Sequence, residues 1–153
     1  MANYATNVDL QKILPTILSF GVSDWTDQLT LATADVLELI KVDWFRQAAN
    51  DRWGLTQGYL NSSDFPALDE DKLDTTKLVE LTCYRALAHY IMPILTNDAG
   101  VEDQFFVKME RYQDRYKDEW DVVKRRALYD FDGDGNFDDV ERFRKRGVRF
   151  ARA

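Results

Sequence analysis

Six oxygen-bearing side chains near the C-terminal end of the chain follow the spacing of a cation-binding loop. The stretch YDFDGDGNFDDVE contains the candidate ligands, which are Asp130, Asp132, Asp134, Asn136, Asp138 and Glu141. A hard cation such as Ca²⁺ takes six to eight oxygen ligands at about 2.3–2.6 Å, and a loop of twelve residues can supply them. The spacing therefore predicts a calcium site between residues 130 and 141.

The remaining positions of this stretch resemble the EF-hand loop. Gly135 stands where the chain turns sharply around the ion, Asn136 would offer its backbone carbonyl, and Glu141 would close the site with both carboxylate oxygens. Phe137 stands where an apolar residue anchors the loop to the core. The alternative is a connection whose acidic residues serve only as caps and turn formers. Five carboxylates at the ligand positions would repel one another strongly without a cation, which favours the calcium reading.

The flanks of the loop argue against a calcium switch. A sensor exposes an apolar groove when its helices open, whereas here Arg125 and Arg126 precede the loop and basic residues follow it. No second loop of this kind occurs in the sequence. We therefore predict a structural calcium ion that fixes the direction of the basic tail. A single-loop calcium-binding regulatory protein is the competing reading.

The last twelve residues, RFRKRGVRFARA, hold six basic residues and no acidic one. After Gly147, apolar and basic residues alternate with a period of two, as in an extended segment that pairs with another chain. An acidic body with a basic arm suits head-to-tail association of identical subunits. It equally suits binding to nucleic-acid phosphate. The arm residues are Arg142, Arg144, Lys145, Arg146, Val148, Arg149, Phe150 and Arg152.

The composition fits one domain with a buried core. The chain has 153 residues, of which 45% are hydrophobic, and its formal net charge is −7. Its single cysteine, Cys83, excludes an internal disulfide framework and fits a buried helical position. No apolar run reaches the roughly 20 residues that span a bilayer, and no signal peptide is visible.

Apolar residues at intervals of three and four predict three long helices. The first begins near residues 30–33 and ends near 52. The second covers 75–96, with Asp74 as its N-cap and a kink or end at Pro93. A turn at residues 97–100 leads to the third, 101–129, whose buried stripe is Phe105, Met109, Tyr112, Tyr116, Trp120 and Val123.

The predicted fold is all-α, a small helical bundle on long antiparallel helices with a C-terminal extended arm. Residues 1–141 form the helical domain and residues 142–153 form the basic arm. The segment 53–71 is rich in turn formers but carries three aromatic residues, and its role is left open. No catalytic motif is present, and the only histidine, His89, has no nucleophile signature nearby, so we predict that the protein is not an enzyme.

The order of these features resembles the head–tail connector family of tailed bacteriophages, also called adaptor or head-completion proteins. The resemblance covers about residues 25–153. It rests on LTLATADVLELIKVDWF, LTCYRALAHYIMPILT and DQFFVKMERYQDRYKDEWDVVKRR, followed by YDFDGDG and the basic terminal arm. The resemblance lies in the pattern and order of the helices. The completeness of the calcium-like loop is a departure, since membership does not require it.

The resemblance implies a structural virion protein at the head–tail interface, made in the host cytoplasm. Copies of the subunit, usually twelve, would form a ring beneath the portal protein, and DNA would pass through the central channel. The arm, residues 142–153, would be the portal-docking segment, and the ring would offer a landing surface for the next tail or head-completion component. No membrane partner is implied.

Overall fold

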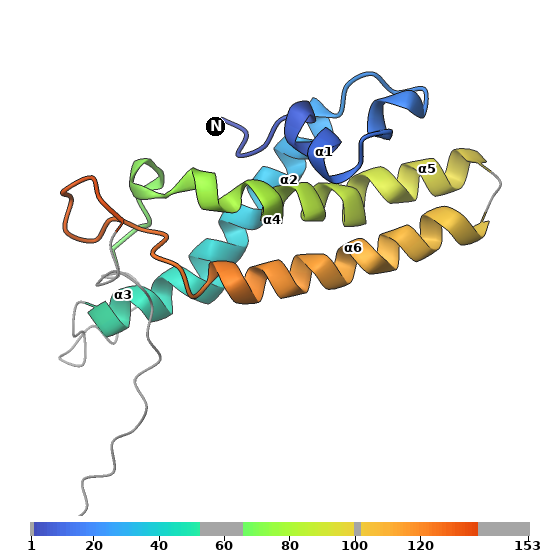
Figure 1. Cartoon of the computed structure of the whole chain (residues 1–153). Helices are drawn as coiled ribbons and strands as arrows, with labels where there is room; N and C mark the ends of the chain where they lie inside the picture. Colours follow the sequence, from blue (N-terminus) through green and yellow to red (C-terminus); the bar gives the residue numbers. More distant parts are fainter. Residues whose placement is uncertain (1, 53–65, 100–101, 138–153) are drawn as a thin grey trace, which may run out of the picture.

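The computed structural model describes residues 2–52, 66–99 and 102–137, and these residues are mostly helical (Figure 1). No strand occurs among them, apart from one isolated antiparallel bridge between Leu73 and Tyr129. The predicted all-α class is confirmed. None of the described helices is long and apolar enough to cross a membrane.

The N-terminal residues fold over the helices through polar caps. Helix α1, Asn7–Ile13, begins with a capping box in which Thr6 and Asp9 each accept a hydrogen bond from the other's backbone N–H. A short 3₁₀ turn, η1 (Ile17–Ser19), follows. Trp25 is almost fully buried, and its indole N–H donates to the carbonyl of Ile17 at 3.3 Å. This tryptophan therefore ties the N-terminal segment to the first long helix.

The first long helix begins earlier than the sequence predicted. Helix α2 covers Thr26–Leu39, and just before it the Asp24 carboxylate accepts hydrogen bonds from both the N–H and the hydroxyl of Thr26, at 3.0 and 2.6 Å, in an Asx turn. It continues through a π-helical turn, η2 (Ile40–Phe45), into α3, Arg46–Arg52. The helical path ends close to the predicted position.

The second helical path is built from four consecutive pieces. They are η4 (Thr75–Leu78), α4 (Val79–Ala86), the π-helical turn η5 (Leu87–Ile91) and α5 (Met92–Ala99), and a 3₁₀ turn, η3 (Glu70–Lys72), precedes them. Of the two effects predicted for Pro93, an end of the helix is wrong, because the path continues to Ala99. The wider π turn lies just before Pro93. Its altered backbone pairing accommodates a proline, which has no N–H to donate. The turn predicted at residues 97–100 is therefore wrong for residues 97–99, which are helical.

Helix α6, Glu102–Val123, is the longest element described. It runs beside α4 and α5 in the opposite direction (Figure 1). Its predicted stripe faces the neighbouring helices: Phe105 and Val123 are buried, and Met109, Tyr112, Tyr116 and Trp120 pack against the two core clusters. The helix ends six residues before the predicted end, and residues 124–129 lead to the acidic loop instead.

Two hydrophobic clusters hold these elements together. One lies between the N-terminal segment, α2 and α4–α5, and includes Leu10, Trp25, Leu29, Leu87 and Met92. The other lies where α2, η2 and the end of α6 meet, and includes Val36, Ile40, Trp44, Leu81 and Leu128. Cys83 is fully buried, as predicted. The second cluster supports the acidic loop.

The cap of the second helical path makes stability depend on pH. Asp74 accepts from the N–H of Thr76 at 3.2 Å and pairs with Lys77 at 2.7 Å. Burial raises the pKa of Asp74, but Lys77 and Thr76 outweigh it and hold that pKa below its ordinary value of 3.8. Because the folded pKa is the lower one, this stabilisation is present above the ordinary value and is lost as pH falls through the folded pKa.

We expect Asp74→Ala to lower the free energy of unfolding by about 1 kcal/mol at pH 7. The loss should shrink as pH falls from about 4 through the folded pKa, because the unfolded carboxylate is protonated first and the folded one only at lower pH. Urea unfolding at pH 7 and pH 3 measures both values, with Asp118→Ala on the exposed face of α6 as the control. An equal loss at both pH values would contradict the assigned role.

Candidate metal centre

The acidic loop is fastened to the start of the second helical path by the isolated bridge. The N–H of Asp74 donates to the carbonyl of Leu128, and the N–H of Asp130 donates to the carbonyl of Lys72, both at 3.0 Å. Beside the bridge, the ring centroid of Phe45 lies 5.0 Å from that of Tyr129. The first ligand position is thus held by backbone pairing and by the aromatic core.

Two glycines give the loop its turn. Gly133 and Gly135 have φ angles of 79° and 82°, in the left-handed region that favours glycine. Their N–H groups both point at Asp130: Gly133 donates to Oδ1 at 2.6 Å and Gly135 donates to Oδ2 at 2.9 Å. Asp130 is only 6% exposed. The chain therefore turns around the Asp130 carboxylate.

The structure brings three predicted ligands together. Carboxylate oxygens of Asp130, Asp132 and Asp134 all lie within 4.8 Å of one another. Oxygens that each lie 2.3–2.6 Å from one ion are at most about 5 Å apart, so this spacing fits Ca²⁺. Asp132 and Asp134 are exposed and accept only local hydrogen bonds, including one from the Asn136 N–H to Asp134 at 2.7 Å. The second oxygen of Asp134 also accepts from the side-chain amide of Asn136, at 3.2 Å.

The electrostatics of Asp130 favour its charged form. Burial raises its pKa, but the N–H groups of Gly135 and Gly133, together with Asp132 and the charge of Lys72, hold the net pKa below its ordinary value. The Lys72 ammonium lies beside the loop, 3.7 Å from the point that a Cβ atom would occupy if residue 133 were not glycine. A carboxylate that is ionised and aimed by backbone amides is ready to bind a metal without releasing a proton.

The far side of the loop contacts the same helix start. Phe137, the predicted anchor residue, has the Lys77 ammonium 5.1 Å from its ring centroid. Lys77 also donates to the carbonyl of Ala127 at 2.7 Å. Of the other three predicted ligands, Asn136 is described and exposed, whereas Asp138 and Glu141 lie outside the described residues. The predicted arm and residues 53–65 of the segment 53–71 also lie outside them.

A polar cluster that sequence spacing did not reveal joins α2 to α4 and η5. One carboxylate oxygen of Asp35 accepts from Arg85 Nε at 2.8 Å and from the Tyr90 hydroxyl at 2.5 Å. The Arg85 guanidinium also lies over the ring of Tyr116, 5.4 Å from its centroid. The donors stand 50 and 55 residues from Asp35, so no local pattern signals the contact.

We expect Asp35 and Arg85 to be energetically coupled. The pair is partly exposed, with side-chain exposures of 33% and 26%, so solvent screening limits the coupling free energy to about 0.5–1 kcal/mol. A double-mutant cycle with Asp35→Ala and Arg85→Ala, followed by urea unfolding, measures it. Strictly additive losses would show that the ion pair contributes nothing to stability.

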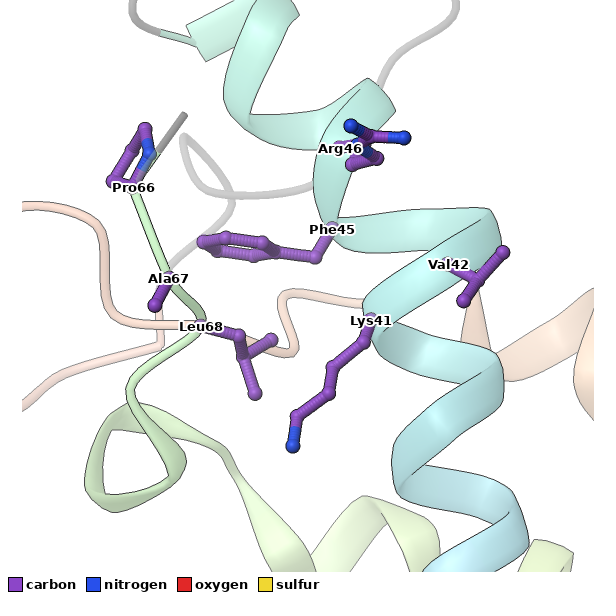
Figure 2. A pocket seen from close by; sticks show the side chains of 7 residues that line it. All are labelled: Lys41, Val42, Phe45, Arg46, Pro66, Ala67 and Leu68. Carbon is purple, nitrogen blue, oxygen red and sulfur yellow. The ribbon is translucent and has the colours of Figure 1, made fainter. Parts of the chain in front are cut away.

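A cavity of about 460 Å³ opens between η2 and residues 66–68 (Figure 2). Its lining is Lys41, Val42, Phe45, Arg46, Pro66, Ala67 and Leu68. Lys41 pairs with Glu70 at 3.3 Å. Among the described residues, the lining therefore offers two cationic side chains beside apolar ones.

Two further titratable side chains, Cys83 and His89, lie outside the acidic loop. Burial raises the pKa of Cys83 to about 12, which keeps its thiol protonated at neutral pH. His89 is at the surface, and its ring centroid lies 6.2 Å from that of Tyr116. Partial burial of the ring lowers the pKa of His89, and the nearby charge of Arg85 lowers it further.

Comparisons with protein-family models, with curated proteins and with solved structures find no match to this chain.

Proposed function

We propose that this protein is a structural virion subunit whose copies form a ring that joins the portal of a phage head to the tail. The observation that carries the proposal is the element order at the C-terminal side of the molecule. The α4–α5 path lies beside α6, and the chain then passes directly into a fastened acidic loop. A strongly basic segment, residues 142–153, follows in the sequence. This is the order on which the resemblance to connector proteins rests.

The metal centre has a structural part in this function. Asp130, Asp132 and Asp134 would hold Ca²⁺ at the point where the helical body gives way to the basic segment. The bridge at Leu73 and Tyr129 fixes the entry to the loop. A bound ion would fix the exit as well, and so direct the basic segment toward a neighbour in the assembly. We expect calcium to raise the melting temperature and to leave helix content unchanged.

The acidic body supports the channel part of the proposal. Residues 1–141 carry 27 acidic and 14 basic residues, because the other six of the 20 Lys and Arg lie in the arm. A wall of negative potential would let DNA slide through a ring without sticking to it. A basic channel surface in an assembled ring would contradict this part of the proposal.

Negative-stain imaging of the purified protein, alone and mixed with a portal protein, tests the function most directly. Closed rings that stack on portals are expected. Solitary copies under both conditions, at protein concentrations where connectors assemble, would overturn the proposal. Because isolated subunits of some assemblies close into rings only on their partner, the mixture with the portal is the decisive sample.

The clustered aspartates favour one second candidate, a single-loop calcium-binding regulatory protein. Circular dichroism and calcium titration distinguish the two functions. A regulatory protein should change its helix content or expose apolar surface when calcium binds, whereas a structural site should mainly raise thermal stability.

A further inference from the structure

The outward face of α2 and of the first turn of η2 carries a stripe of acidic and apolar residues. The stripe consists of Asp27, Leu31, Ala34, Glu38 and Val42, which follow one another at intervals of four, three, four and four residues. All five are exposed, and Leu31 and Val42 are 51% and 56% exposed. The opposite face of α2, which includes Leu29, Val36 and Leu37, is buried. We call these five residues the α2 stripe.

The charge of the α2 stripe is not neutralised within the described part of the molecule. Neither Asp27 nor Glu38 forms an ion pair there, whereas Asp35 on the flank is bound to Arg85. Between residues 26 and 40 the sequence contains no Lys or Arg. The stripe is therefore an apolar surface with uncompensated negative charge.

We infer that residues 142–153 of a neighbouring copy bind along the α2 stripe. This segment holds six basic residues and no acidic one, and in an extended conformation Arg146, Val148, Phe150 and Arg152 would share one face. Such a strand can place apolar side chains on Leu31, Ala34 and Val42 while its arginines reach Asp27 and Glu38. Charge complementarity of this kind selects the partner and sets the register.

The dimensions of the two partners agree. Fifteen helical steps separate Asp27 from Val42, so the α2 stripe is about 22 Å long. Residues 146–152 span about 20 Å when extended. The described chain stops at Phe137, and the sixteen residues 138–153 reach about 50 Å when extended, enough to leave one subunit and cross to another. The neighbouring copy is the one that the proposed ring supplies, so the inference rests on that function and names its intersubunit contact.

Disulfide trapping tests the contact in the full-length chain. The double variant Leu31→Cys with Phe150→Cys is oxidised mildly and analysed on a non-reducing gel. Cys83 stays in place, because it is fully buried. A ladder of covalent multimers that dithiothreitol collapses is expected. The matched control pairs Phe150→Cys with Val107→Cys, at a valine on α6 that is 60% exposed and lies outside the stripe.

Each other outcome of this trapping overturns the inference. A fast-migrating monomer band would show that the segment folds back onto its own α2. The absence of a disulfide, or an equal yield from the control pair, would show that the stripe is not the receptor.

A deletion of residues 148–153 tests the same contact. If residues 142–153 bind the portal instead, the deletion will abolish portal binding and leave the mass of the subunit oligomer unchanged, which would overturn the inference.

Charge reversal provides an independent readout. The variant Asp27→Lys with Glu38→Lys should reduce the trapped yield at least about tenfold, because two attractive contacts become repulsive. Adding Arg146→Glu and Arg152→Glu should restore it, whereas Glu110→Lys with Asp118→Lys on α6 should have little effect. Rings that form on portals without any 31–150 disulfide would overturn this contact alone. Solitary copies in every sample would overturn the proposed function as well.

Discussion

Asp130→Asn is expected to weaken calcium binding about 100-fold, the largest functional effect of any single substitution in the described loop. The change removes the negative charge of the most buried ligand. It also leaves one of the two glycine N–H groups facing an amide nitrogen, because Asp130 accepts from Gly133 and Gly135 through different oxygens. Isothermal titration with calcium measures the affinity.

Two comparisons make this result specific. Asp118→Asn removes an exposed carboxylate from α6 and should leave calcium affinity unchanged. Glu141→Gln, at the predicted closing ligand, should also weaken binding severely, since calcium then loses an anionic oxygen. Wild-type affinity in the Asp130 variant, with helix content preserved by circular dichroism, would place the ion elsewhere. A wild-type chain that takes up no calcium would show that the loop is only a turn.

Trp25→Ala is expected to lower the free energy of unfolding by about 3–5 kcal/mol, the largest stability effect among the residues discussed. The side chain is 1% exposed, and it contacts the N-terminal segment on one side and the α2–α4 core on the other. Its removal leaves a cavity and frees the carbonyl of Ile17 from the indole N–H. Urea unfolding followed by circular dichroism measures the loss.

Trp25→Phe is the matched control for this substitution. It keeps an aromatic ring in the core but cannot donate to Ile17, so it should cost less than half as much as alanine. Equal losses for the two variants would show that the hydrogen bond, and not the buried volume, dominates at this position. A loss below about 1 kcal/mol for alanine would show that the N-terminal segment packs only loosely on α2.

Local patterns were sufficient to predict the long helices and the first half of the loop. The α6 stripe was predictable because Phe105, Tyr112 and Val123 repeat with the period of a helix, and the helix buries the face that this period defines. The turn at Gly135 was predictable because glycine favours the positive φ that the structure shows there. In both cases the determining interactions lie close together in the sequence.

The errors arose where distant or competing interactions decide the structure. Helix α2 begins at Thr26, directly after a turn in which Asp24 binds the Thr26 N–H, and several residues that could start such a turn precede the apolar pattern. Pro93 stays within a helical path, and a π turn precedes it. No single residue in the sequence indicates that turn. The Leu73–Tyr129 bridge and the Asp35–Arg85 pair join segments at least 50 residues apart, so only the folded chain brings them together.

The Leu73–Tyr129 bridge gives the molecule a mechanical property. It ties the two ends of the α4–α6 unit together, so tension applied to the chain beyond Phe137 is first resisted by the two backbone hydrogen bonds at Asp74 and Asp130. The load then passes to the base of α4 as well as to the last turn of α6. A force applied from outside the subunit is thereby shared between α4 and α6, instead of unwinding α6 alone from its C-terminal end.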